Sequence, residues 1–343
     1  MTRIYIVAEI GCNHNGDIEI AKKMIEEAKI CKVDAVKFQT FNSKELISKY
    51  APKAEYQKKT TGKDESQLEM TKKLELSHDD YLELRDYALS LGLDTFSTAF
   101  DMESIKFLEE SGQSVWKIPS GEITNIPYLE RIRDIKVKNK EIILSTGMST
   151  IEEIEFAVEI LKQSENTNIT ILHCNTEYPT ADVDVNLNAI LELKDKFPEY
   201  QIGLSDHSIG TVAAVVAVAY NIKFIEKHFT LDKNFYGPDH KASATPDELY
   251  ELCNNVRRAE LMLGKKEKIV TPSEAKNKSI ARKSIVAKKA ILKGEIFDEK
   301  NITCKRPGNG ISPIHWYEVI GRVAERDFEE DELIKVNDIS WQE

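Results

Sequence analysis

The chain has 343 residues, enough to bury a large core and to form either one large domain or two domains. Its composition is that of an ordinary globular protein, and its formal net charge of -11 argues against nucleic acid or an anionic membrane surface as a partner. No apolar run is long enough to span a membrane as a helix, which excludes an integral membrane protein of that type.

Short apolar or β-branched runs alternate with amphipathic segments of helical periodicity over the first three quarters of the chain. No two successive runs are joined by hairpin signals, so the alternation is typical of parallel strands connected by helices. Eight runs are predicted to be strands, at residues 4–11, 35–40, 93–100, 115–121, 141–147, 169–174, 201–207 and 223–230.

The segments between these strands carry helix start signals. Asp17 and Ser77 each precede a helical pattern as potential N-caps, and Ser149 or Thr150 is followed by a glutamate three residues on. Thr245 begins a capping box with proline at the first helical position. Repeated strand and helix pairs with these starts predict a (β/α)8 TIM barrel.

The barrel pattern ends near Gly264, which places a catalytic domain at residues 1–264. Residues 41–76 form an unusually long connection, and such loops are uncommon unless they are functional or disordered. The charged segment 265–282 has no sustained apolar periodicity and is interpreted as a linker. Short strand-like runs separated by turns then predict a small β-rich domain over residues 283–343, with runs at 284–291, 301–305 and 332–336.

Cysteine usage and the N-terminus bear on the cellular compartment. The five cysteines are odd in number and form no CxxC pair, which favours reduced thiols over disulfides or a thiolate zinc site. The first apolar run stops at Glu9 without a cleavage-site pattern, so no signal peptide is predicted. We therefore expect a cytoplasmic protein.

In a (β/α)8 barrel the active site lies at the carboxyl ends of the strands. Here nearly every predicted strand ends in polar residues, which indicates an enzyme. The candidates at these ends include Glu9, Lys37, Gln39, Ser97, Thr98, Lys117, Ser120, Glu122, Ser145, Thr146, Ser205, Asp206, His207, Glu226 and His228.

His207 and His228 end two neighbouring strands and would converge there as neutral imidazoles, the commonest ligand type for a divalent metal. Two protein ligands leave positions for substrate and water, as a catalytic metal requires. The alternative is that one or both rings simply hydrogen-bond backbone at a strand end.

Lys37 and Lys117, together with the hydroxyl groups at the same ends, would form a ring of cations and donors suited to a phosphate. Alternatively, the lysines snorkel from strand ends and the serines cap helices. Glu9, Glu122 and Asp239 are candidates for orienting hydroxyls or moving protons, although such carboxylates also form structural ion pairs.

Nine motifs in order resemble the bacterial sialic acid synthases, which condense phosphoenolpyruvate with N-acetylmannosamine. The motifs are "AEIGCNHNG", "VKFQTF", "KIPSGE", "ILSTGM", "HCNTEYPT", "GLSDHS", "IEKHFT", "GPDH" and "KRPGNGISP". They span nearly the whole chain, including the C-terminal module known as the antifreeze-like or SAF domain. The chain departs from the better-studied branch at Thr176, in "FSTAF" and in "YPTADV".

The resemblance implies a role for each matching residue. His207 and His228 would bind Mn²⁺ or a similar metal such as Mg²⁺ or Co²⁺. Phosphoenolpyruvate would be held by Lys37, Thr98, Lys117, Ser120, Ser145 and Ser205. The N-acetylated amino sugar would be held by Glu9, Gln39, Tyr178 and Asp239, with Arg306 supplied by the SAF domain of a partner subunit in a domain-swapped homodimer. The family further implies carbohydrate biosynthesis for capsule or lipopolysaccharide.

Three other activities remain open at this point. Relatives make legionaminic acid from a 2,4-diacetamido hexose, so the sugar is not fixed. A metal-free Schiff-base aldolase would use a barrel lysine, for example Lys117, as nucleophile. A binding protein would use the C-terminal module for ice or carbohydrate and the barrel as a scaffold, but the complete set of polar strand ends argues against it.

Overall fold

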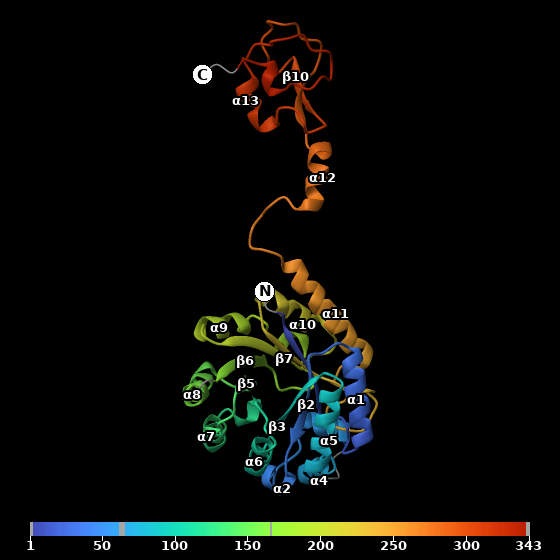
Figure 1. Cartoon of the computed structure of the whole chain (residues 1–343), viewed down its shortest axis with the longest axis vertical. Coiled ribbons are helices and arrows are strands. Elements are labelled where there is room, and N and C mark those ends of the chain that lie inside the picture. The colour runs from blue at the N-terminus through green and yellow to red at the C-terminus, as the bar shows by residue number, and fades with distance from the viewer. Residues whose placement is uncertain (1–2, 62–65, 165–166, 341–343) are drawn as a thin grey trace. The chain divides into compact units, whose positions relative to one another are not determined.

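The computed structural model describes residues 3–61, 66–164 and 167–340 (Figure 1). The chain divides into two compact units, Met1–Gly264 and Lys265–Glu343, and each is described by itself below. Within the described residues, no helix is long and apolar enough to cross a membrane.

The first unit contains an eight-stranded parallel sheet in the order β3-β2-β1-β8-β7-β6-β5-β4. Its two end strands, β3 and β4, also contact each other, so the sheet curls into a (β/α)8 barrel. The predicted fold class is therefore confirmed. The strands are β1 (Tyr5–Gly11), β2 (Ala35–Thr40), β3 (Asp94–Ala99), β4 (Val115–Ile118), β5 (Glu141–Ser145), β6 (Asn168–Cys174), β7 (Gln201–Asp206) and β8 (Phe224–His228).

Helices surround these strands in the first unit (Figure 1). Their buried apolar faces pack on the outside of the sheet and form the largest hydrophobic core of the chain. The main helices are α1 (Ile18–Ile30), α5 (His78–Ser90), α6 (Met102–Glu110), α7 (Ile126–Asp134), α8 (Ile151–Leu161), α9 (Ala189–Lys196), α10 (Val212–Ala217) and α11 (Pro246–Leu263).

The helix starts lie where the sequence predicts them. Asp17 caps α1 and Ser77 caps α5, each through its side-chain oxygen. Of the two candidates for α8, Thr150 is the N-cap and forms a capping box. Thr245 forms another at the start of α11. These caps satisfy amide groups that a helix leaves unpaired at its N-terminus.

The barrel interior is apolar at the amino ends of the strands and polar at the carboxyl ends. A small cluster of inward-facing apolar side chains, which includes Val7, Phe96 and Phe224, fills the lower layer. Gly203 of β7 belongs to this tight layer, because a Cβ there would lie 2.5 Å from Leu172 and 2.7 Å from the backbone oxygen of Phe224. The polar candidates therefore stand on a packed apolar floor.

The barrel is not fully closed by backbone pairing. Among the described residues, no ladder hydrogen bond joins β3 to β4. Instead, the buried Gln113 side chain replaces part of the missing ladder, since it accepts from the Ser97 amide at 2.8 Å and donates to the Ser97 carbonyl at 2.9 Å. One glutamine thus connects the two edge strands.

The long connection at 41–76 contains three short helices, α2 (Ser43–Leu46), α3 (Glu55–Thr61) and α4 (Gln67–Lys72). Ser66 caps α4 through a capping box. The Tyr236 hydroxyl, in the loop after β8, donates to the Thr61 carbonyl at 3.0 Å. The described part of this insertion is therefore structured and contacts another loop at the carboxyl end of the barrel.

The second unit has its own small hydrophobic core and contains β9 (Ser284–Ala287), β10 (Ile302–Lys305), α12 (Pro272–Ala281) and α13 (Trp316–Val319). One sequence expectation differs from the structure here. The run at 332–336 makes only an isolated bridge, Leu333 to Val286, and is not a strand. The segment interpreted as a linker includes the exposed helix α12, which begins with a capping box at Thr271.

Candidate active site

Alternate residues along a strand face the same side of a sheet, so every second residue of each strand points into the barrel. At the carboxyl ends these inward positions carry most of the polar residues that the sequence singles out. Those that are buried at this mouth are Glu9, Lys37, Thr98, Lys117, Ser145, Ser205, His207, Glu226 and His228.

Four of these residues form a buried charge cluster. Lys37 Nζ lies 2.7 Å from Glu9 Oε2 and 3.7 Å from Glu226 Oε2. Lys117 Nζ lies 3.4 Å from Glu226 Oε1. Two carboxylates thus neutralise two ammonium groups, and Glu226 sits between both lysines. Buried charges require such partners because desolvation is costly.

The environment shifts the pKa values of the two carboxyl groups in opposite directions. Burial raises the pKa of Glu9 above its ordinary value, in spite of the nearby Lys37. Burial acts on Glu226 in the same direction, but Lys117 and Lys37 outweigh it and lower its pKa to about 2. Burial also lowers the pKa of Lys117. Glu226 is therefore a fixed anion, whereas Glu9 is the carboxyl group closer to proton exchange.

Hydroxyl and amide groups complete the polar layer. Lys37 Nζ donates to Thr98 Oγ1 at 3.1 Å, and Ser205 Oγ donates to Glu226 Oε1 at 3.0 Å. Gln39 Nε2 donates to Glu9 Oε1 at 2.8 Å. The Ser145 hydroxyl is buried and has no hydrogen-bond partner among the described residues. An unsatisfied buried hydroxyl at this position favours a bound ligand or water.

The two histidines lie side by side above this layer. Their ring centroids are 5.2 Å apart, and the Tyr178 ring lies 4.1 Å from that of His207 and 5.4 Å from that of His228. Desolvation lowers the pKa of His228 well below its ordinary value, with a further contribution from His207. His228 is therefore a neutral imidazole near pH 7.

The donor set suits a divalent metal with few protein ligands. His207 Nδ1 contacts the Asn175 carbonyl, an orienting bond that leaves Nε2 free of the backbone. His228 Nδ1 is buried and has no partner among the described residues. No group of three or more His, Cys, Asp or Glu side chains suited to a metal occurs in the described part of the chain. Of the described residues, His207 and His228 are the candidate metal ligands.

A second buried ion pair fixes the strand ends that carry the histidines. Lys227 Nζ lies 2.8 Å from Asp206 Oδ2, and both side chains are almost completely buried. Asp206 also accepts from the Ser208 amide at 2.9 Å. Because these residues adjoin His228 and His207, the pair holds β7 and β8 together beside the imidazoles.

Four other predicted site residues do not belong to the buried charge cluster. Asp239 is buried, burial raises its pKa to about 6, and the nearby His207 acts in the opposite direction. Ser120 Oγ accepts from the Gly147 amide at 2.9 Å, which ties the ends of β4 and β5 together. Glu122 does not join the cluster, since it is half-buried and accepts from Asn125 at 2.6 Å. Arg306 is an exposed residue of the second unit.

Glu226 is the central residue to which the sequence analysis assigned no role. It was counted among the polar candidates at the strand ends, because it lies on the same face of β8 as His228, but no function was given to it. Its two lysine partners lie on β2 and β4, and a sequence period does not reveal such contacts across a barrel.

The fold and this arrangement define a (β/α)8-barrel enzyme whose buried polar site lies at the carboxyl ends of the strands. The chain belongs to the NeuB family, whose model matches residues 24–268, and residues 282–340 match the SAF domain.

Comparison with individual proteins agrees with this assignment. The chain is 50% identical to the N,N'-diacetyllegionaminic acid synthase of Campylobacter jejuni over 98% of its own length and 100% of the relative. It is 41% identical to the enzyme of the same name from Legionella pneumophila, over 92% of its own length and 89% of that relative. The chain also superposes on the crystal structure of N-acetylneuraminic acid (sialic acid) synthetase from Leptospira borgpetersenii in complex with citrate. The TM-score is 0.71 and the sequence identity is 35%, over 80% of this chain and 90% of that chain.

Proposed function

We propose that this protein is an N,N'-diacetyllegionaminic acid synthase, which condenses phosphoenolpyruvate with a 2,4-diacetamido hexose and water and releases phosphate. The observation that carries the proposal is the 50% identity to the Campylobacter jejuni enzyme over the full length of that relative. N-acetylmannosamine, the substrate first expected from the motifs, is the second candidate.

The buried charge cluster supports a phosphoenolpyruvate site. Lys37 and Lys117 supply the two cations, and the hydroxyls of Thr98, Ser145 and Ser205 surround them. Glu226 lies within ion-pair distance of both ammonium groups and orients them. Substrate phosphate and carboxylate oxygens would take over contacts that the glutamates make, so the cations are positioned before the substrate arrives.

The reaction forms one carbon–carbon bond and breaks one carbon–oxygen bond. The enol carbon of phosphoenolpyruvate attacks the aldehyde carbon of the open-chain sugar, water adds at C2, and the tetrahedral intermediate releases phosphate. Glu9 is suited to proton exchange with the aldehyde oxygen or the water, because its pKa is raised and its partners are Lys37 and Gln39. His207 and His228 would hold Mn²⁺ or a similar divalent metal, which when bound would polarise the aldehyde.

The apolar surface around the mouth supports a homodimer in which the SAF domain of a partner subunit covers the site. Exposed apolar side chains occur in the segments that follow β5, β6 and β7, namely Met148, Val183, Ile209 and, at the start of α10, Val212. Exposed clusters of this kind mark interaction surfaces. The second unit also exposes Ile314 and Tyr317.

Steady-state assays with both sugars test the substrate. We expect kcat/KM for the 2,4-diacetamido hexose to exceed that for N-acetylmannosamine, because the sugar acceptor distinguishes the two kinds of synthase. A preference for N-acetylmannosamine would overturn the legionaminic acid proposal and leave the condensation intact.

Water labelled with oxygen-18 tests the reaction course. The label should appear in the nine-carbon acid, and label in the phosphate would contradict carbon–oxygen cleavage.

The lowered pKa of Lys117 is a feature that suits a Schiff-base aldolase. Covalent trapping of pyruvate by borohydride, together with activity that survives EDTA, would favour that alternative.

A further inference from the structure

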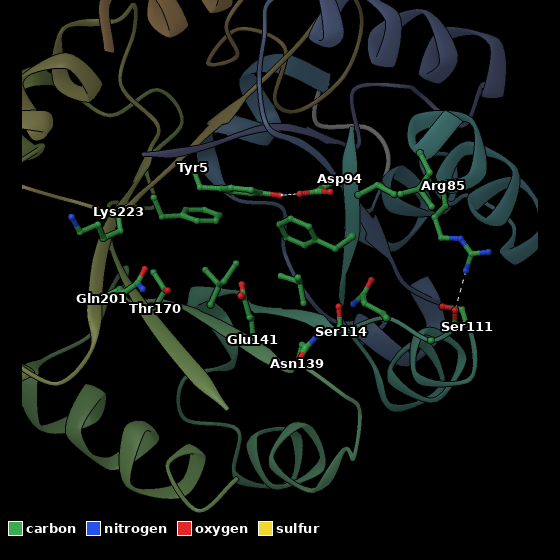
Figure 2. A pocket seen from close by; sticks show the side chains of 18 of the residues that line it. Tyr5, Arg85, Asp94, Ser111, Ser114, Asn139, Glu141, Thr170, Gln201 and Lys223 are labelled. Atoms are coloured by element: carbon green, nitrogen blue, oxygen red, sulfur yellow. Dashed lines mark hydrogen bonds between the residues drawn. The ribbon is translucent and has the colours of Figure 1, made fainter. Parts of the chain in front are cut away.

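A large cavity lies at the opposite end of the barrel from the candidate active site. Its volume is about 790 Å³, within the roughly 300–1,000 Å³ that is typical of small-molecule sites. Figure 2 shows side chains from the amino ends of several strands pointing into it. None of the residues assigned to phosphoenolpyruvate, the sugar or the metal lines this cavity.

Aromatic rings form its floor. Tyr5 and Phe224 stack with their centroids 5.8 Å apart and an interplanar angle of 23°. Phe96 of β3 lines the same space. These rings belong to the apolar layer that separates the cavity from the charge cluster above. They offer flat apolar surface to a ligand of matching shape.

The cavity continues through the incompletely paired seam between β3 and β4. Residues from both strands line it, and so do Tyr81, Arg85 and Leu89 of α5, which lies outside the barrel. The Thr95 hydroxyl lines the seam and is buried without a hydrogen-bond partner among the described residues. An elongated ligand that carries a hydrogen-bond donor would satisfy this group.

Two carboxylate side chains line the cavity. Asp94 and Glu141 are the first residues of β3 and β5, and both line the cavity. The Asp94 carboxylate accepts from the Tyr5 hydroxyl at 2.6 Å, and Glu141 has no side-chain partner among the described residues. Burial raises the pKa of Tyr5, and the negative charges of Asp94 and Glu141 raise it further. Both carboxylates therefore lie near the Tyr5 hydroxyl.

Each of the three cationic side chains of the lining has a polar partner other than Asp94 and Glu141. Arg3 pairs with Asp34 at 2.6 Å. Arg85 donates to Asp86 and to the Ser111 carbonyl, as the dashed line in Figure 2 marks for the latter. The Lys223 ammonium donates to Asn221 at 3.1 Å. The cavity combines aromatic faces with two carboxylates that form no ion pair among the described residues, an environment that recognises organic ammonium ions.

We propose that this cavity is a second small-molecule site, which binds an organic ammonium ion with a flat aromatic body. The rings of Tyr5, Phe96 and Phe224 contact the body, and the carboxylates of Asp94 and Glu141 receive the ammonium group. This site is separate from the proposed condensation, so its test does not depend on the identity of the sugar.

Tryptamine is a suitable probe, and indole-3-propionate is its control, because the two share a ring and differ in the sign of their charge. Calorimetric titration of the full-length protein should show saturable binding of tryptamine and none of indole-3-propionate. Glu141→Gln and Asp94→Asn should each weaken binding roughly tenfold, the effect of losing one charge-assisted contact. Both positions are exposed, so these variants should fold.

Glu159→Gln is the matched control, since Glu159 is an exposed carboxylate of α8 that does not line the cavity. This variant should bind tryptamine like the unchanged protein. Circular dichroism verifies the fold of each variant, and either of the two cavity variants suffices for the comparison. Absence of saturable tryptamine binding, equal affinity in all variants, or equal binding of indole-3-propionate would each overturn the proposal.

Discussion

Lys117 is the residue on which the proposed phosphoenolpyruvate site depends most directly. It is buried, and its ammonium group lies 3.4 Å from the Glu226 carboxylate. Replacement by methionine keeps the apolar stem and removes the charge. Lys117→Met should therefore weaken phosphoenolpyruvate binding about tenfold to a hundredfold, the value of one charge-assisted contact at about 1.5 to 3 kcal/mol.

Calorimetry with phosphoenolpyruvate measures this effect. Lys106→Met is the control, because Lys106 is an exposed residue of α6 whose ammonium group lies 3.9 Å from Glu110. Unchanged affinity in Lys117→Met would place the phosphate site elsewhere in the barrel.

The two neighbouring imidazoles predict a metal-dependent enzyme. His228→Ala removes one of the two adjacent imidazoles, so both Mn²⁺ binding and activity should be lost. The thermal midpoint should change little, because strand-end residues lie outside the apolar layers that hold the barrel together. His315→Ala, at an exposed position of the second unit, serves as control. A His228→Ala enzyme with full activity in metal-free buffer would contradict the metal assignment.

Asp239 predicts a pH dependence. Burial raises its pKa to about 6, so the carboxylate ionises only as the pH rises through that value. If the ionised form accepts hydrogen bonds from sugar hydroxyls, kcat/KM for the sugar should fall as the pH is lowered through about 6. Asp239→Asn should raise KM and remove this limb of the pH profile. A limb that persists unchanged in the variant would assign the titration to another group.

Residue types at strand ends were predictable because the barrel rule specifies where function lies, but their partners were not. The sequence indicated that Lys37 and Lys117 face one mouth. It did not indicate that Glu226 neutralises both, since that contact depends on barrel curvature. Likewise, Glu122 follows β4 directly, yet a short turn aims its carboxylate at Asn125. The local turn geometry sets the direction of the Glu122 side chain, and the periodicity of the sequence does not reveal that direction.

At the scale of elements, the seam between β3 and β4 has no ladder hydrogen bonds among the described residues. Gln113 makes two hydrogen bonds to the backbone of Ser97 and is buried. Gln113→Leu leaves the Ser97 amide and carbonyl without these partners, and we expect a loss of unfolding free energy of about 1–3 kcal/mol for each group that stays unpaired. Urea unfolding measures this loss.

Gln163→Leu provides the control for that experiment, because Gln163 is an exposed glutamine after α8. Its effect should be small, as for other surface substitutions away from special features. Equal stability of the Gln113→Leu variant and the unchanged protein would show that water or backbone movement replaces the glutamine.

Strands and caps were predictable because they depend on short-range patterns. All eight strands lie at the predicted places, and Thr150 was one of the two residues proposed as the cap of α8. The second unit was harder, because its chain is short and its apolar residues are few. The run at 332–336 has a strand-like composition but contributes only one bridge, since tertiary packing overrides β propensity.

At the scale of the whole molecule, the question is which barrel each SAF domain serves. Arg306 is the only proposed site residue in the second unit, and its side chain is exposed. The loop that carries it is well anchored, since Ser284 Oγ donates to the Pro307 carbonyl at 2.6 Å and accepts from the Gly310 amide at 2.8 Å. Such a loop can present a guanidinium group at a defined position.

Arg306→Ala should raise KM for the amino sugar and leave the binding of metal and phosphoenolpyruvate nearly intact. Mixing this variant with inactive His228→Ala tests whether the domains cross. If they cross, a mixed dimer has one site with an intact barrel and an intact arginine, and activity returns. If each domain serves its own barrel, one site lacks the arginine and the other lacks the imidazole, so activity does not rise. Absence of recovery after verified subunit exchange would therefore assign Arg306 to its own chain or to the surface.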